Sequence, residues 1–518
     1  MNNIPNLCIG DVSPNGQVSI LDEDRLSYSV LNNSKGAVGI RTISKSLLNE
    51  FIGYIIEHPD NTPTEVRNEL CGRTKIDKFE YGYASTLCIM AQMAISKRNA
   101  YITDKSNENQ NRLSPDDISY ISAIKTKPFV ILGGFSGTGK SQKVKELAFA
   151  TCPNNSHLRT SETAPGNYLL LSVKPNWHDA TEITGFRSSV NRNYYVTDFM
   201  RFLIKAMHFP NVPFFVCLDE MNLAPVEEYF TDFLSVIESR KKTSSGQIVT
   251  DAIIPASVFN EEYNDNFCIF DCLGFERMDR GMTDDGLHET LLGKFIRIDL
   301  INKIKRDGLT IPSNVIIIGT VNMDDTTNSF SRKVIDRAMT FETVVGKFSD
   351  EYFNSDVALN YVKNPLNGEL FLSDEVRATQ MIDEGRFILT KEEQTKILNF
   401  INDINEDLDG SPFKISYRIL NETILLYRSK KRIAEIMKDE DGLADGVEFK
   451  TDLNTIFDDI LMQKVLPRIE GDYEKCSKCL NKLSSRADNN EWQKSYDKIE
   501  FMIKRFGSDR SGFTSFWN

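Results

Sequence analysis

The sequence predicts an α/β core built on a parallel five-stranded sheet, preceded by a small mixed α+β module and followed by an α-helical domain. Three observations predict this class. From about residue 126, five short apolar runs alternate with helical patterns. These runs are β-branched and lack polar alternation, which is typical of strands buried on both faces. A glycine-rich turn followed by lysine comes directly after the first run.

The composition bounds the class of protein. A chain of 518 residues is expected to form roughly two to four domains. Hydrophobic residues make up 40% and charged residues 26%, as in globular proteins. The net charge of −13 argues against a surface that binds nucleic acid everywhere. Any contact with DNA is therefore expected at a local patch, in a pore or through a partner.

The sequence also indicates where the protein works. No apolar run approaches the ~20 residues that cross a bilayer, and the first residues lack the features of a signal peptide. We expect a cytoplasmic protein with no membrane partner. The nine cysteines are scattered, which favours reduced, buried thiols over disulfides. Cys476 and Cys479 have zinc-knuckle spacing, but no second pair accompanies them, so we favour thiols there too.

Residues 1–125 are expected to form a target-recognition or partner module. Turn residues Pro14 to Gly16 lie between short alternating runs and predict a hairpin. Apolar periodicity predicts helices over 43–58 and 83–97. The polar segment 103–117 is typical of a linker.

Residues 126–385 are expected to form the α/β core, with an insertion at about 241–310 that is long for a connection within such a core. Residues 386–518 are expected to form the helical domain. The predicted strands cover 128–135, 167–175, 212–220, 314–322 and 338–345, and the predicted C-terminal helices cover 391–408, 417–437 and 453–469.

The turn after the first strand reads GFSGTGKS and matches the phosphate-binding pattern G-x-x-x-x-G-K-[ST] at every required position. Backbone N–H groups of a tight curl can cradle a triphosphate, glycine permits that curl, and the next helix directs its positive end at the phosphates. We expect the lysine near the β- and γ-phosphates and the serine hydroxyl on Mg²⁺. The expected nucleotide contacts are Gly134, Phe135, Ser136, Gly137, Thr138, Gly139, Lys140 and Ser141.

Two further strands end in polar side chains. In the run FFVCLDEMN, the apolar strand ends at two adjacent carboxylates, Asp219 and Glu220. They are either solvated acids after a strand or, if buried, groups that need a cation. Downstream of a phosphate loop, Asp219 is expected to hold Mg²⁺ and Glu220 to orient and deprotonate the attacking water. The run NVIIIGTVN ends at Asn322, whose amide can hold that water if the sheet is parallel. Asn after a strand is more often a turn former.

Taken together, these segments resemble an AAA+ ATPase, and more narrowly the McrB-like branch of NTP-driven motor subunits in modification-dependent restriction systems. The resemblance covers roughly residues 126–470 and excludes the N-terminal module. The segments that carry it are GFSGTGKS, VKPNWHDATEITGF, LDEMNLAPVEEYFTDFLSVIESR, GTVNMDDTTNSFSRKVIDRAMTFE, SYRILNE and LMQKVLPRIEGD.

The resemblance implies roles for residues that are otherwise ordinary. Asn322 resembles the sensor 1 residue, and Arg337 the arginine finger that reaches a neighbouring subunit, with Arg332 as the alternative. Arg418 resembles the sensor 2 arginine of the lid that contacts nucleotide. The family's Met-Asn-x-x-Asp-Arg stretch is matched at Asn322 and at Asp325, which we place in the catalytic set, but Thr326 replaces the arginine.

The resemblance also implies partners. Members of this branch form rings, usually hexamers, and drive a separate McrC-type endonuclease on DNA. The expected function is therefore Mg²⁺-dependent hydrolysis of ATP or GTP in a restriction or anti-phage system. The choice between ATP and GTP stays open. Two alternatives stay open as well: a MoxR-like remodelling chaperone acting on proteins, and a nucleotide switch that does not hydrolyse.

Overall fold

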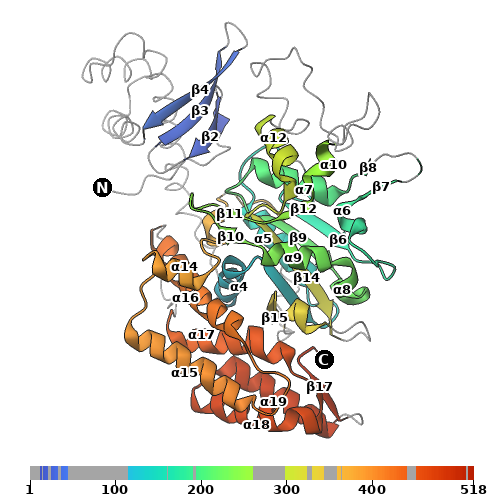
Figure 1. Cartoon of the computed structure of the whole chain (residues 1–518), viewed down its shortest axis with the longest axis vertical. Coiled ribbons are helices and arrows are strands. Elements are labelled where there is room, and N and C mark those ends of the chain that lie inside the picture. The colour runs from blue at the N-terminus through green and yellow to red at the C-terminus, as the bar shows by residue number, and fades with distance from the viewer. Residues whose placement is uncertain are drawn as a thin grey trace. The chain divides into compact units, whose positions relative to one another are not determined.

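The structure is a computed structural model in which the chain divides into two compact units (Figure 1). The first comprises residues 1–111, 207–211 and 267–302, and the second comprises residues 112–206, 212–266 and 303–518. The residues that the structure describes are 12–13, 16–21, 25–32, 37–44, 115–159, 161–188, 190, 194–260, 298–323, 330–343, 359–362, 364–439, 451–508 and 512–517.

The first unit contains a four-stranded antiparallel sheet in the order β1-β2-β3-β4. Its strands are β1 (Val12–Ser13), β2 (Gly16–Leu21), β3 (Arg25–Asn32) and β4 (Ala37–Ser44). Ser13 pairs with Gly16, so the predicted hairpin is confirmed. The helix predicted over 43–58 starts inside β4 and otherwise lies outside the described residues, as does the helix predicted over 83–97.

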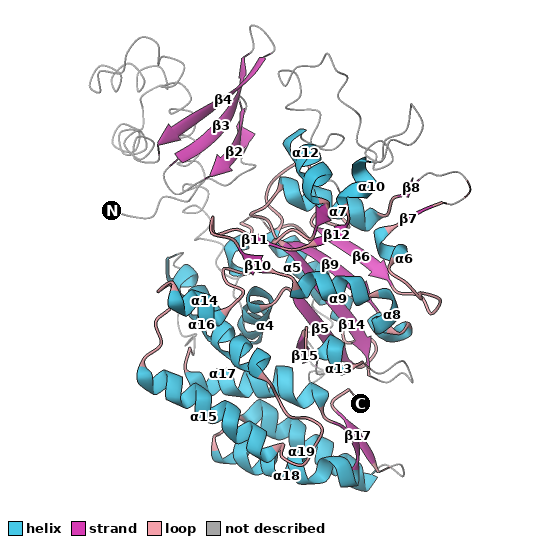
Figure 2. Ribbon diagram, viewed as in Figure 1, coloured by secondary structure: helices cyan, strands magenta, loops and turns pink. Residues whose placement is uncertain are grey.

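The second unit is built on a five-stranded sheet whose neighbouring strands are all parallel, in the order β15-β5-β14-β9-β6 (Figure 2). The prediction of a parallel five-stranded sheet is confirmed. Its central strands are buried almost throughout, which explains why their sequences are apolar without alternation. The strands are β5 (Phe129–Gly134), β6 (Tyr168–Ser172), β9 (Phe214–Asp219), β14 (Val315–Asn322) and β15 (Met339–Thr343).

Helices and short strands connect these five strands. Helix α5 packs against β5, β14 and β9. The connecting elements are α5 (Lys140–Thr151), α6 (Thr181–Thr184), β7 (Phe186–Arg187), β8 (Tyr194–Tyr195), α7 (Asp198–His208), η3 (Met221–Leu223), α8 (Val226–Tyr229), α9 (Thr231–Glu238) and α13 (Arg332–Ile335).

The predicted insertion at 241–310 has its own secondary structure on both sides of residues 261–297, which lie outside the described residues. Strands β10 and β11 pair antiparallel, and so do β12 and β13. Its elements are β10 (Lys241–Lys242), β11 (Ile248–Val249), β12 (Ala252–Ile254), α10 (Ala256–Asn260), α12 (Ile298–Asp307) and β13 (Leu309–Thr310).

Helix α4 (Pro115–Thr126) begins inside the segment predicted to be a linker. It contacts β5, β15 and α16, so it belongs to the core rather than to a connecting segment. Pro115 occupies its first position, where the missing N–H costs nothing. At its other end, the buried Lys125 Nζ donates to the carbonyls of Glu369 at 2.8 Å and Leu372 at 2.6 Å.

The C-terminal part is helical, and the three helices predicted there are confirmed. The last of them, α17, continues into a π-helix, η7, and a 3₁₀-helix, η8. Two further helices and a two-stranded sheet follow. The elements are η6 (Gly368–Leu370), α14 (Ala378–Asp383), α15 (Lys391–Asp407), α16 (Tyr417–Asp439), α17 (Leu453–Ile460), η7 (Leu461–Val465), η8 (Leu466–Arg468), β16 (Glu470–Asp472), α18 (Tyr473–Asn489), α19 (Gln493–Ser508) and β17 (Phe513–Ser515).

The C-terminal segment returns to the sheet through Trp517. Its indole N–H donates to the carbonyl of Pro467 at 3.0 Å, and its ring lies 5.2 Å from that of Phe330. A Cβ placed on Gly133 would lie 3.2 Å from the indole and 2.4 Å from the Met323 methyl. A side chain at 133 would therefore displace the Met323 methyl and press on the indole, so close packing favours glycine there.

Two further expectations concern membrane-spanning helices and the state of the cysteines. Within the residues that the structure describes, no helix is both long and apolar enough to cross a bilayer. The described cysteines, Cys152, Cys217, Cys476 and Cys479, are all buried free thiols. Burial raises the pKa of Cys476 to about 12, and the described part of the chain holds no cluster of His, Cys, Asp and Glu that would bind a metal around it.

Candidate active site

The glycine-rich turn joins the carboxyl end of β5 to the first turn of α5. Gly137 and Gly139 have φ of 78° and 76°, in the left-handed region that other residues rarely adopt. Gly134 is constrained by space, because a Cβ there would lie 2.1 Å from Thr343 Oγ1 and 2.8 Å from the Thr343 carbonyl oxygen. The glycines thus allow a curl of backbone N–H groups at a helix N-terminus, which is an arrangement suited to phosphate.

The lysine of the turn lies inside this curl. Lys140 is buried, and its Nζ donates to the carbonyls of Gly134 at 2.9 Å and Phe135 at 2.7 Å. Thr138 Oγ1 donates to the Phe135 carbonyl at 2.9 Å, which closes the loop, while the Phe135 ring is about half exposed. The ammonium is therefore held against the carbonyl oxygens at the start of the glycine-rich turn.

The two predicted metal ligands lie in contact. Ser141, in the first turn of α5, donates its hydroxyl proton to Asp219 Oδ1 at the carboxyl end of β9. Mg²⁺ takes oxygen ligands and commonly uses one or two protein groups together with substrate phosphates and water. A hydroxyl and a carboxylate beside the glycine-rich turn fit that ion, because Mg²⁺ does not need a cage of protein carboxylates.

Glu220 follows Asp219 in an unusual backbone conformation. Its φ of 54° and ψ of 49° are in the left-handed region, which costs a non-glycine residue free energy. This conformation directs Glu220 away from the strand direction, and its carboxylate accepts a hydrogen bond from Asn322 Nδ2 at 3.1 Å. The side chain is exposed, so a water molecule can reach it.

Thr320 connects the two acids and was not predicted from the sequence as a site residue. Its buried hydroxyl donates to Asp219 Oδ1 at 2.8 Å and accepts from the Glu220 backbone N–H at 3.0 Å. Thr320 and Asn322 are two residues apart on β14, so their side chains share a face of the sheet. The available signal was a lone hydroxyl in the otherwise apolar run VIIIGTVN.

Strand register explains why these groups meet. Asn322 pairs with Gly134 across β14 and β5, and Gly319 pairs with Leu218 across β14 and β9. The ends of three adjacent parallel strands therefore present the curl, the amide and the two acids at one edge, which we call the carboxyl edge. Asp325 lies outside the described residues.

The three candidate arginines lie at the opposite edge, which we call the amino edge. Arg337 precedes β15, whose Met339 pairs with Val130 and whose Thr343 pairs with Gly134. Arg337 is thus separated from the glycine-rich turn by the length of β15, about 13 Å at ~3.3 Å per residue. Arg332 donates to the Pro412 carbonyl at 2.7 Å.

Arg418 meets Arg337 rather than the glycine-rich turn of its own chain. Both guanidinium groups donate to Glu238, the last residue of α9, with Arg337 on Oε2 and Arg418 on Oε1. Arg337 also donates to the Lys333 carbonyl at 3.0 Å. Glu238 was not predicted from the sequence, because no local pattern indicates its partners, which are 99 and 180 residues away.

The segment that carries Arg337 is held by a buried lysine of the π-helix η7. Lys464 Nζ donates to the carbonyls of Asp336 at 3.1 Å and Ala338 at 2.6 Å, on either side of Arg337. It also pairs with Glu422 at 2.9 Å, and Glu422 pairs with Lys127. Burial lowers the pKa of Lys464 to about 8, although Glu422 opposes this effect. The helical region therefore fixes the position of Arg337.

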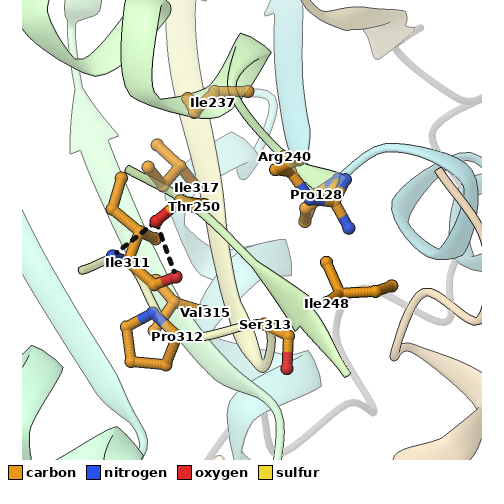
Figure 3. A pocket seen from close by; sticks show the side chains of 10 residues that line it. All are labelled: Pro128, Ile237, Arg240, Ile248, Thr250, Ile311, Pro312, Ser313, Val315 and Ile317. Carbon is orange, nitrogen blue, oxygen red and sulfur yellow. Dashed lines mark hydrogen bonds between the residues drawn. The ribbon is translucent and has the colours of Figure 1, made fainter. Parts of the chain in front are cut away.

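A small cavity of about 20 Å³, enough for about one water molecule, lies at the same edge (Figure 3). It is lined by apolar side chains, among them Ile237 and Ile311, and by Arg240. Burial lowers the pKa of Arg240 to about 10. Its Nη2 atom is buried without a hydrogen-bond partner among the described residues.

The C-terminal part of the chain is similar to a known protein family. Residues 372–511 match a protein-family model described as "Domain of unknown function (DUF8727)". No curated protein matches the chain. The match covers the C-terminal helices α14 to α19 and leaves the five-stranded sheet outside it.

Proposed function

We propose that this chain is a Mg²⁺-dependent nucleoside triphosphatase of the AAA+ class. The observation that carries the proposal is the carboxyl edge, where Lys140 and Ser141 meet Asp219, Glu220 and Asn322. A phosphate-binding curl, an oxygen pair suited to Mg²⁺ and an exposed carboxylate oriented by an amide are the groups that hydrolysis of a triphosphate needs. ATP and GTP remain alternative substrates, since no described residue indicates a base contact.

The reaction we propose is in-line attack of water on the γ-phosphorus. Glu220 takes a proton from the water, whose oxygen forms the new P–O bond as the bond to the bridging oxygen breaks and the diphosphate leaves. Asn322 holds the Glu220 carboxylate in place. Lys140 offsets charge on the phosphates. Ser141 and Asp219 would hold Mg²⁺, which neutralises phosphate charge when bound.

We propose further that the protein acts as a ring, as in the McrB-like branch that it resembles. The position of Arg337 and Arg418 supports this idea, because they lie at the edge away from the glycine-rich turn of their own chain and so are available to a second copy. In this proposal the ring drives a McrC-like endonuclease on DNA, with the first unit selecting the target. That residues 1–111 form part of a separate unit supports such a role.

The test is phosphate release by the full-length chain with ATP or GTP, with Mg²⁺ or with a chelator. We expect release that requires Mg²⁺ and is lost in Lys140→Ala, while Lys145→Ala, a matched change on the same helix, retains it. Release that persists in Lys140→Ala, or no release with either nucleotide, would overturn the proposal. Adding DNA and the product of an adjacent gene then tests the restriction setting.

A further inference from the structure

Glu238 forms an uncommon contact at the amino edge. Its two carboxylate oxygens each accept from a different guanidinium, Arg337 on one and Arg418 on the other. The side chains of Glu238, Arg337 and Arg418 are 41%, 21% and 35% exposed, so solvent reaches all three. One carboxylate therefore occupies two guanidinium groups on an accessible surface.

The charges around this contact do not balance. Burial lowers the pKa of Arg468, and the nearby charges of Arg332 and Arg418 lower it further. Arg468 also pairs with Asp336 at 3.3 Å. The basic edge, which we define as Arg332, Arg337, Arg418 and Arg468, thus has four positive charges. Among the described residues, Glu238 and Asp336 oppose them through direct ion pairs, and Glu422 acts on Arg468 from further away. An anion with more charge than a carboxylate would be attracted to this surface.

The hydrogen bonds are incomplete as well. In the described part of the chain, Arg337 Nε and Ser331 Oγ are buried without a hydrogen-bond partner. A buried donor without an acceptor destabilises the arrangement that leaves it unpaired. The contact with Glu238 therefore leaves Arg337 incompletely satisfied, which favours its exchange for a ligand with more acceptor oxygens.

We propose that Glu238 is an intramolecular substitute for a phosphoryl group. In a free subunit it holds Arg337 and Arg418, and it releases both when a triphosphate bound at the carboxyl edge of a second copy presents its terminal phosphate. Carboxylate and phosphoryl groups both offer paired oxygens to a guanidinium, but the phosphoryl group carries more charge and a third oxygen. The inference rests on the proposed function and adds Glu238 to it as a residue that competes with the neighbouring nucleotide.

The competition has a measurable consequence. A subunit whose arginines are occupied must break two ion pairs before it can complete a neighbour's site. The apparent affinity between subunits with nucleotide bound is therefore reduced in proportion to the fraction of subunits whose arginines are free. A residue that instead positions the arginines for catalysis would leave assembly unchanged and raise the maximal rate. The two roles therefore differ in whether the concentration dependence or the maximal rate changes.

The experiment measures phosphate release per subunit against protein concentration for the full-length wild type, Glu238→Gln and Asp232→Asn. The control, Asp232→Asn, removes one charge from the exposed face of the same helix. We expect Glu238→Gln to reach half of its maximal rate at about tenfold lower concentration, a shift of ~1.4 kcal/mol, with a maximal rate within about twofold of wild type. Sedimentation with a non-hydrolysable triphosphate should show the same shift.

Several outcomes would overturn the inference. Glu238→Gln that behaves as Asp232→Asn, or that loses maximal rate at all concentrations, would exclude competition. Glu238→Gln made in an Arg337→Ala, Arg418→Ala background should not shift assembly, and a shift there would show that Glu238 acts elsewhere. If Glu238→Gln fails to fold, Glu238→Asp takes its place, because its shorter side chain cannot span both guanidinium groups and should shift assembly in the same direction. A wild type that binds and hydrolyses no nucleotide would instead refute the proposed function itself.

Discussion

The two edges of the five-stranded sheet differ in how fully their charged side chains are paired. At the carboxyl edge, each acid has a partner within the chain: Asp219 accepts from Ser141 and Thr320, and Glu220 accepts from Asn322. At the amino edge, arginines outnumber the acids with which they pair, and Arg337 Nε has no partner among the described residues. The difference fits the proposed function, in which one edge holds the site and the other contributes groups to the site of a second copy.

The largest expected effect comes from removing an arginine of the amino edge. Arg337→Ala should lower turnover by about 10³-fold or more, because an arginine supplied to a neighbour stabilises transition-state charge. Mixing it with Lys140→Ala should restore part of the activity, since mixed neighbours combine an intact curl with an intact arginine. Phosphate release against mixing ratio is the measurement. If Arg332→Ala is inactive and Arg337→Ala is active, the two arginines exchange roles, and a lack of complementation argues against a shared site.

The next largest effect comes from replacing an acid of the carboxyl edge. Glu220→Gln should lower turnover by about 10²- to 10⁴-fold, the usual contribution of a positioned general base. Its amide cannot accept the proton, but the curl, Lys140 and Asp219 are unchanged, so nucleotide affinity should stay within a few-fold. Stopped-flow binding and phosphate release measure the two quantities separately. Glu228→Gln, an exposed change on α8, is the control, and equal turnover in both variants would contradict the assignment.

A smaller effect sharpens the picture of the carboxyl edge. Thr320→Val keeps the shape of the side chain and removes the hydroxyl that joins Asp219 to the Glu220 backbone. Losing about one net hydrogen bond, ~1 kcal/mol, should slow turnover by about fivefold to tenfold. Thr340→Val is a stringent control, because Thr340 is buried on β15 and its hydroxyl has no partner in the described structure. Equal effects of the two changes on turnover would show that Thr320 acts only through packing.

The smallest expected effect is a loss of stability at low pH, caused by protonation of a buried carboxylate near the amino edge. Burial would raise the pKa of Glu422, but Lys127 and Lys464 outweigh burial and lower it below its ordinary value of 4.5. The stability that this carboxylate adds is therefore present above pH 4.5 and is lost as the pH falls through the lowered pKa. Thermal unfolding from pH 7 to pH 3 should show wild type losing more stability than Glu422→Gln. Parallel curves for the two proteins would contradict this account.

The sequence predicted the carboxyl edge well because its signals are local. The strands at 129–134, 214–219 and 315–322 are apolar runs, and each ends in the glycine, acid or amide that the site uses. Parallel strands then bring these ends together without further information. Thr320 is the exception, since a hydroxyl inside an apolar strand does not by itself indicate a partner on the next strand.

The amino edge was less predictable because its contacts join distant segments. Neither the pairing of Glu238 with Arg418 nor that of Lys464 with the Arg337 segment leaves a periodic signal, and each depends on how the C-terminal helices pack on the core. Helix α4 was missed for a different reason: its first residues are polar and follow a long polar stretch. Its packing against α16 and the sheet defines it as a helix of the core.

The indole of Trp517 gives the molecule an internal optical reporter. It lies against the strand that leads into the glycine-rich turn, where a Cβ on Gly133 would be only 3.2 Å from the ring. Because indole emission responds to nearby charge and to changes in packing, this one side chain would register an anion entering the turn. Of the other two tryptophans, Trp492 is buried against the Phe400 ring among the C-terminal helices and would provide a steady background, while Trp177 packs on Tyr229, whose hydroxyl donates to the carbonyl of Met221 beside Glu220.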